Sequence, residues 1–187
     1  MDAFSYLSVL LSIIIGLGLT QVLTASGRLI RHRERVRAYW PSLVWAAVLL
    51  LIFVQAWWAM FGMRRHTDWT FFTFLMVLLQ TVTLYMMAAV VLPEEVDEAG
   101  VDLRAYYERQ RGWLFGFLLA TLVVSVVKDV ALTGALPGPA NLGFHAFLAG
   151  AAVSAIVVRR ARYHEVLAVV GAVAMGAYIA LLFARLQ

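Results

Sequence analysis

Two adjacent ionisable residues, Lys128 and Asp129, lie inside a long apolar stretch. A charge at the centre of a bilayer costs at least about 2.5–3.5 kcal/mol, so a pair in this position is a candidate functional site. Lysine there attracts an anionic group, or titrates if it is buried. The competing interpretation is structural: Lys128 extends to the nearer membrane interface and Asp129 lies among lipid headgroups. Because adjacent helical residues point about 100° apart, we expect the pair not to face one pocket centre.

Polar residues of other apolar stretches are expected at the same depth as Lys128. Counting about 1.5 Å per helical residue places Gln55, His145 and Tyr178 at this level, in the third of the membrane farthest from the arginine-rich loops. If they share a face, they form a vestibule or binding pocket. His145 is then a candidate proton relay, although a lone histidine on an apolar helix is more often a hydrogen-bonded structural residue. The candidate polar cluster is Gln55, Lys128, Asp129, His145 and Tyr178.

Uncharged polar residues also occur elsewhere in the first and third apolar stretches. Tyr6 and Ser8 enter at the level of the candidate cluster. A deeper set comprises Thr20, Gln21, Thr24, Gln80, Thr81, Thr83 and Tyr85. Such residues either hydrogen-bond neighbouring helices, worth about 0.6 kcal/mol on average, or line an aqueous path.

The composition shows which elements must position these residues. Of 187 residues, 63% are apolar and 14% are charged, against about 45–50% and about 25% in soluble domains. Such a chain cannot cover its surface with polar groups. We therefore predict an all-α integral membrane protein, a six-helix transmembrane bundle with short loops, forming a single domain over residues 1–187. The expected spans are 4–27, 41–63, 69–92, 113–133, 141–158 and 164–184.

The segments between the spans are short, with one exception. Short turns predict antiparallel hairpins for spans two and three, four and five, and five and six. The longer segment Glu94–Arg111 holds six acidic residues and three arginines. Asp102 is placed to cap a short helix over 103–107. Gly16 and Gly18 in the first span permit a kink or a close approach.

The distribution of arginine predicts the orientation. Segments after the first, third and fifth expected spans hold eleven arginines, whereas the other side holds Arg64, Arg65 and Arg185. Cytoplasmic loops are enriched in Lys and Arg, so we expect both termini outside the cytoplasm of a prokaryotic inner (plasma) membrane. The net charge of +4 follows from this bias, and we expect no nucleic-acid partner.

Small residues recur every four positions in the last two spans. Such stripes let helix backbones approach closely, within the bundle or across a homo-oligomer interface. The helix-packing residues are Ala146, Gly150 and Ser154, followed by Ala168, Ala172, Gly176 and Ala180.

Several kinds of chemistry are absent from the sequence. The chain has no cysteine, which excludes disulfides and thiolate metal sites. It carries no signature of a zinc protease, serine hydrolase, nucleotide-binding loop or dinucleotide-binding fold. Bis-histidine haem ligation requires two intramembrane histidines, and of the four in the chain only His145 lies well inside an expected span, since His164 is at the edge of the sixth. We expect no cofactor and no metal site, and the sequence does not favour an enzyme.

The first span opens with Ala3-Phe4-Ser5, which resembles the Phe-Ser motif of the prokaryotic relatives of lysosomal potassium channels. Those proteins also have six spans and a similar length, and the resemblance implies an ion channel. It covers a few residues, lacks the acidic residue that usually follows the serine, and requires the N-terminus inside. It keeps a channel among the candidates without assigning a family.

Two functional hypotheses follow. The first is a small oligomeric transporter or channel subunit for an ion or small polar solute, with the candidate polar cluster as its site. The second is a non-transporting scaffold, sensor or lipid-binding protein that works through its small-residue stripes and the segment Glu94–Arg111. Membrane lipid is the expected partner in both, with a homo-oligomer possible and the ligand unknown.

Overall fold

The structure, a computed structural model, describes residues 3–182. Within that range it has six long helices, each apolar and long enough to cross a membrane, which confirms the all-α six-helix fold. The helices are α1 (Ala3–Arg31), α2 (Trp40–Met63), α3 (Phe71–Val91), α4 (Leu103–Thr133), α5 (Pro139–Val157) and α6 (Ala161–Leu182). The end of the expected sixth span, at 183–184, and Arg185 lie outside the described residues.

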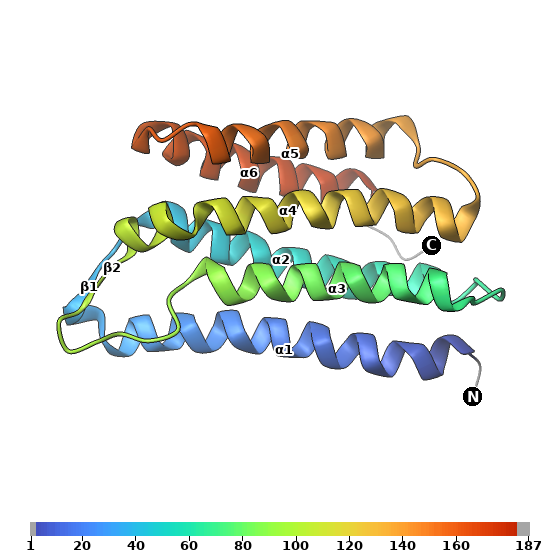
Figure 1. Cartoon of the computed structure of the whole chain (residues 1–187), viewed down its shortest axis with the longest axis horizontal. Coiled ribbons are helices and arrows are strands. Elements are labelled where there is room, and N and C mark those ends of the chain that lie inside the picture. The colour runs from blue at the N-terminus through green and yellow to red at the C-terminus, as the bar shows by residue number, and fades with distance from the viewer. Residues whose placement is uncertain (1–2, 183–187) are drawn as a thin grey trace.

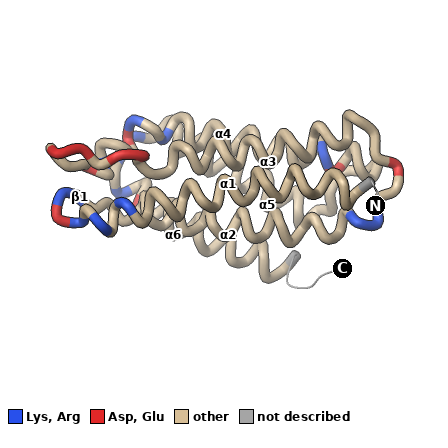
Figure 2. Tube along the Cα trace, turned by 90° about the horizontal axis from the view of Figure 1, so that it is seen from below, with Lys and Arg blue, Asp and Glu red and all other residues tan. Residues whose placement is uncertain are grey.

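The six helices run alongside one another in a single bundle (Figure 1). Helix α3 packs chiefly on α4 and α1, whereas α2 packs chiefly on α6 and α4 packs also on α5. Charged residues gather at the two ends (Figure 2). We name the end that contains Arg28–Arg37, Arg104–Arg111 and Arg159–Arg162 the basic end, and the end that contains the α2–α3 turn the opposite end.

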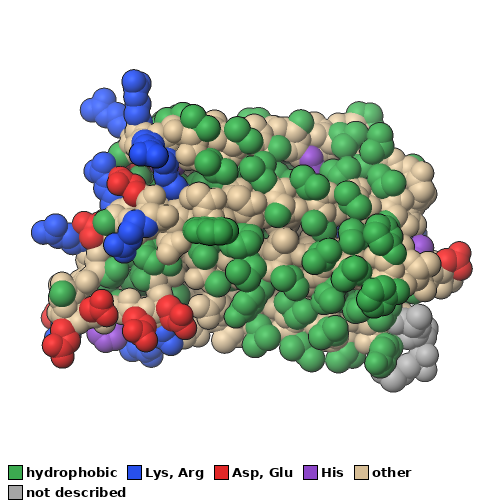
Figure 3. Space-filling model, viewed as in Figure 1, with side chains coloured by type: hydrophobic (Ala, Val, Ile, Leu, Met, Phe, Trp, Pro, Cys, Tyr) green, Lys and Arg blue, Asp and Glu red, His purple; other side chains and the backbone are tan. Residues whose placement is uncertain are grey.

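The middle of the bundle presents apolar side chains outward (Figure 3). Leu17, Val123 and Val173 are between 54% and 66% exposed, which is the pattern of a surface solvated by lipid. Inside, the Phe53 ring packs directly on the α1 backbone, because a Cβ added to Gly18 would lie 2.2 Å from it. This is the close approach expected at Gly18.

Helix α4 differs from the sequence-based expectation. Asp102 does cap a helix, since its side chain accepts from the backbone N–H groups of Arg104 and Ala105. That helix is not a short separate one, however, but continues without interruption into the fourth span over 31 residues. Gly112 does not interrupt it, and the helix ends only at Gly134, whose φ of 70° is left-handed. An Arg104–Glu108 ion pair of 3.1 Å supports the first turns.

The two long segments at the basic end are joined by a feature that the sequence did not predict. Strand β1 (Val36–Arg37), which follows the short 3₁₀ helix η1 (Arg33–Arg35), pairs in parallel with β2 (Val101–Asp102). Gly100 makes the approach possible, because it has a φ of 83° and a Cβ there would lie 2.3 Å from the Arg35 carbonyl oxygen. Arg28 also donates to the backbone carbonyl of Glu94. The α1–α2 and α3–α4 connections are therefore tied together.

Candidate functional site

A cavity of about 550 Å³ extends into the bundle from the opposite end. Exposed Arg65 and half-buried His66, in the α2–α3 turn, mark its mouth, and Leu84 lies at its deep side. Leu84 is 13 residues into α3, or about 20 Å at 1.5 Å per residue. The cavity therefore passes the midpoint of a hydrocarbon core about 30 Å thick. Its polar lining residues are Gln55, Arg65, His66, Gln80, Thr81, Ser125, Lys128, Asp129, Thr133, Asn141 and Tyr178.

Lys128 and Asp129 both line this cavity, contrary to the expectation from their 100° separation on the helix. The reason is the length of the lysine side chain: its Nζ lies 3.2 Å from Asp129 Oδ1, so the ammonium group turns toward its neighbour. The two side chains are 14% and 27% exposed. An ion pair that faces a polar cavity avoids the cost of presenting either charge to lipid.

Tyr178 and His145 meet at the first turns of α5. The Tyr178 hydroxyl donates to Asn141 Oδ1 at 3.3 Å, and His145 Nδ1 lies 2.9 Å from the Asn141 carbonyl oxygen. A carbonyl oxygen only accepts, so Nδ1 carries a hydrogen and donates it to Asn141. Pro139 starts α5, which places Asn141 in the first turn and His145 one turn later.

His145 itself lines a second cavity, of about 70 Å³, deeper in the bundle. Gln55, Gln80, Ser125 and Tyr178 line both cavities, so the two are contiguous. The structure thus brings four residues of the candidate polar cluster to the larger cavity and the fifth, His145, to the smaller one. Beyond them, Thr121 donates to Thr83 Oγ1 at 2.9 Å, a packing contact between α4 and α3.

Residues near the start of α1 do not join this site. Tyr6 is 72% exposed, and Ser8 lines a separate crevice beside Trp57 and Trp58. Phe4, of the motif that resembles the channel family, stacks on Trp69. Of the deeper uncharged set, Gln80 and Thr81 line the larger cavity, whereas Thr20, Gln21, Thr24, Thr83 and Tyr85 line neither cavity.

Five polar residues of the larger cavity were missed as site residues by the sequence analysis: Arg65, His66, Ser125, Thr133 and Asn141. For Ser125 a signal was present, because it precedes Lys128 by three residues and so lies on the same helix face. Asn141 lies four residues before His145, with the same implication. No such spacing identifies the two residues of the α2–α3 turn.

The helix-packing stripes have mixed surroundings. On α6, Ala168 is buried, Ala172 is half-buried, and Gly176 and Ala180 are exposed. Ala146, Gly150 and Ser154 of α5 line a groove beside α6. A close approach of α6 to α2 occurs at Gly171, outside the stripe, where a Cβ would lie 2.6 Å from the Trp45 ring.

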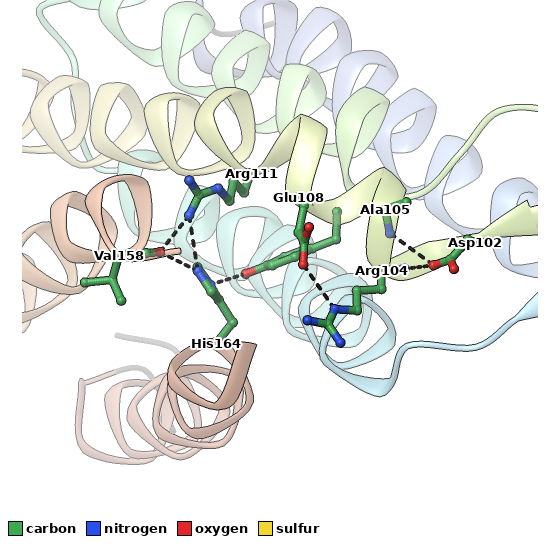
Figure 4. Close-up of polar contacts among 8 residues, drawn as sticks. Asp102, Arg104, Ala105, Glu108, Arg111, Val158 and His164 are labelled. Carbon is green, nitrogen blue, oxygen red and sulfur yellow. Dashed lines mark hydrogen bonds and ion pairs between the residues drawn. The ribbon is translucent and has the colours of Figure 1, made fainter. Parts of the chain in front are cut away.

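A second buried polar cluster closes the basic end of the bundle (Figure 4). The imidazole of His164 is almost fully buried, and its Nε2 lies 2.8 Å from the Val158 carbonyl oxygen and 3.4 Å from the Arg111 guanidinium. The shorter contact is to an atom that only accepts, so Nε2 carries the hydrogen. The Tyr107 hydroxyl then donates to Nδ1 at 2.9 Å. Arg111 donates to the carbonyl oxygens of Val158, at 2.6 Å, and Ala155, at 3.3 Å. The cluster fastens α4 to the α5–α6 turn.

Within residues 3–182, no three histidine or acidic side chains come together as a group that could hold a metal ion. Comparison of the chain with protein-family models, curated proteins and solved structures finds no match.

Proposed function

We propose that this membrane protein is a small transporter or channel subunit that takes an ion or small polar solute into the cavity at the opposite end. One observation carries the proposal: polar side chains from α2, α3, α4, α5 and α6 converge on a cavity of about 550 Å³ inside the bundle. A helix bundle that needs only to be stable fills this space with apolar side chains.

The charges of the cavity favour an anionic or neutral polar solute. Two cations, Lys128 and Arg65, and one carboxylate, Asp129, line it. The carboxamides of Gln55 and Gln80 supply donors and acceptors that suit a polar solute of either kind. In this proposal, Lys128 attracts the solute, and His145, which lines the deeper cavity, relays a proton.

Flux from liposomes tests the proposal. Purified protein is reconstituted, and the efflux of chloride, potassium and protons is measured against protein-free liposomes. We expect Lys128→Met to lower the flux at least tenfold. Arg64→Met is the matched control, because it removes a cation from the same end but Arg64 stacks on Phe61 outside the cavity.

A companion variant separates function from folding. Lys128→Met alone strands the Asp129 carboxylate, which by itself destabilises the bundle. The double variant Lys128→Met/Asp129→Asn removes both charges and leaves no stranded ion. Equal flux in wild type and the double variant contradicts the proposal. No flux of any of the three ions through wild type excludes their transport and leaves only a polar solute other than these ions within the proposal.

A second candidate function is a sensor or scaffold. It is favoured by the Tyr107–His164–Arg111 cluster, which links α4 to the α5–α6 turn at the basic end, away from the lining of the larger cavity. A receptor needs a binding cavity but no path through the bundle. Crosslinking from the segment Glu94–Arg111 in native membranes tests it: capture of another protein supports a scaffold, and capture of this chain alone contradicts it.

We further propose that the basic end faces the cytoplasm of a prokaryotic inner membrane, with both termini outside. Eleven of the fourteen arginines belong to this end, as the positive-inside rule requires. The chain has no cysteine, so Glu95→Cys and Asp68→Cys each introduce one unique label. In intact cells, an impermeant maleimide should label only Asp68→Cys; labelling of only Glu95→Cys reverses the topology.

A further inference from the structure

An apolar groove of about 480 Å³ lies between α5 and α6, in the half of the bundle nearer the basic end. Its α5 wall runs from Ala146 to Ser154, about 12 Å at 1.5 Å per residue. That length is close to the depth of one leaflet, half of a hydrocarbon core about 30 Å thick. The groove therefore has the length to follow an acyl chain of the leaflet at the basic end.

The groove is open to the surroundings of the bundle and is suited to hydrocarbon. Phe147 and Val166 on its two walls are 48% and 63% exposed. Its polar groups are already satisfied, since Tyr163 donates to Ser154 Oγ and Ser154 donates to the Ala151 carbonyl oxygen. Small residues on α5 leave the space open: a Cβ at Gly150 meets no atom within 4 Å.

Three arginines stand at the basic end of the groove, in and beside the α5–α6 turn. Arg159, Arg160 and Arg162 are exposed, and basic side chains project from this corner of the molecule (Figure 3). Within residues 3–182 the ion pairs are Arg104–Glu108 and Lys128–Asp129, so none of the three arginines is neutralised by a carboxylate.

Glu165, near the start of α6, is the acidic residue that follows this turn in the chain. It is in neither of the ion pairs within residues 3–182, and it also lies near Tyr39, where burial and then the Glu165 charge raise the pKa of the hydroxyl. Three arginines against this one carboxylate leave a net positive charge beside the apolar groove.

We propose that this groove is a binding site for an anionic phospholipid, with one acyl chain between α5 and α6 and the phosphate on Arg159, Arg160 and Arg162. A second copy of the chain fits less well. In a dimer with a two-fold axis along the membrane normal, the same patch meets itself. The arginines of the two turns would then face one another, and such like-charge juxtaposition is unfavourable.

Native mass spectrometry of the delipidated protein tests the headgroup contact, by titration with phosphatidylglycerol and with phosphatidylcholine of identical acyl chains. We expect preferential binding of phosphatidylglycerol. Each basic residue near the surface contributes about a fivefold factor, so Arg159→Gln/Arg160→Gln should weaken that binding about 25-fold. The matched control is Arg33→Gln/Arg35→Gln, which removes two exposed arginines from the same end.

The groove itself is tested by filling it. Gly150→Leu places a side chain in the open space and should weaken phosphatidylglycerol binding at least tenfold. Gly143→Leu is the control, because Gly143 is exposed on the same helix, a Cβ there also meets no atom within 4 Å, and it does not line the groove. Circular dichroism of each variant verifies that the helices are intact.

Several results overturn the proposal. Equal affinity for the two lipids, or equal loss in the two arginine double variants, means that no headgroup site exists at this turn. If Gly150→Leu binds phosphatidylglycerol with the affinity of wild type, the groove is not part of the binding site. A wild-type dimer that Gly150→Leu converts to a monomer shows that a second copy occupies the groove.

Discussion

Replacement of Arg111 by methionine should loosen the α5–α6 turn from α4. Helix α5 ends at Val157, so the carbonyl groups of its last turn lack helical partners and need other donors. The Arg111 guanidinium supplies them, at 2.6 Å to the Val158 oxygen and 3.3 Å to the Ala155 oxygen. Methionine keeps most of the apolar length of the side chain but donates no hydrogen bond.

The expected cost follows from these contacts. A hydrogen bond from a charged donor contributes about 1.5–3 kcal/mol. In the variant, the Val158 oxygen still accepts from His164 Nε2 at 2.8 Å. Most of the lost stability therefore comes from the Ala155 oxygen, which loses its Arg111 donor. We therefore expect a loss of about 2 kcal/mol in the free energy of unfolding. Arg111→Lys, with one compact donor group, should recover part of it.

Unfolding by sodium dodecyl sulfate in mixed micelles, followed by circular dichroism, measures this loss. Hydrogen exchange at residues 155–163 reports whether the turn opens locally. Arg109→Met is the control: Arg109 is an exposed arginine on the same helix, and such surface changes usually alter stability by less than about 0.5 kcal/mol. If Arg111→Met has the same free energy of unfolding as wild type, or if Arg109→Met loses as much stability as Arg111→Met, the cluster does not hold the turn.

Two further predictions concern packing and pH. Gly18→Ala should lower the free energy of unfolding by about 1–3 kcal/mol, because the new Cβ would collide with the buried Phe53 ring. Gly16→Ala has open space around its new Cβ and should raise the free energy of unfolding by about 0.5–1 kcal/mol. Chemical unfolding of the two variants and of wild type measures both changes. Burial and the Glu165 charge raise the pKa of Tyr39 above its ordinary value of 10.0, so folding favours the neutral phenol and its contribution is lost as pH rises through the folded-state pKa. Tyr39→Phe should flatten the fall in stability above about pH 10; an unchanged slope contradicts the assignment.

The membrane spans could be predicted because length and hydropathy alone define them, and depth follows from a fixed rise per residue. Depth counting placed Gln55, Lys128 and Tyr178 at one level, and the structure places them around one cavity. Rotation about the helix axis was not predictable, because it depends on which helices pack together. The Lys128–Asp129 pair shows a further limit, since backbone direction does not determine where a long side chain ends.

The basic end was the least predictable region. A polar stretch after Asp102 suggested a separate helix, but a helix that leaves the membrane keeps its hydrogen bonds and needs no break at the interface. The pairing of Val36 with Val101 joins two-residue strands 65 positions apart, and such short pieces carry no periodic pattern. Their closeness depends on α1 packing against α3, which no local signal indicates.

The pairing of β1 with β2 also bears on how the protein assembles in the membrane. Strand β2 follows α3 in the chain, so β1 cannot pair with it until α3 and β2 have been synthesised. Helix α2 lacks its chief neighbour for longer, because that neighbour is α6, which follows the other five helices in the chain. Tyr178 of α6 supplies part of the cavity wall. The cavity wall is therefore complete only after α6 has been inserted, so the site cannot form while α1 to α5 alone are in the bilayer.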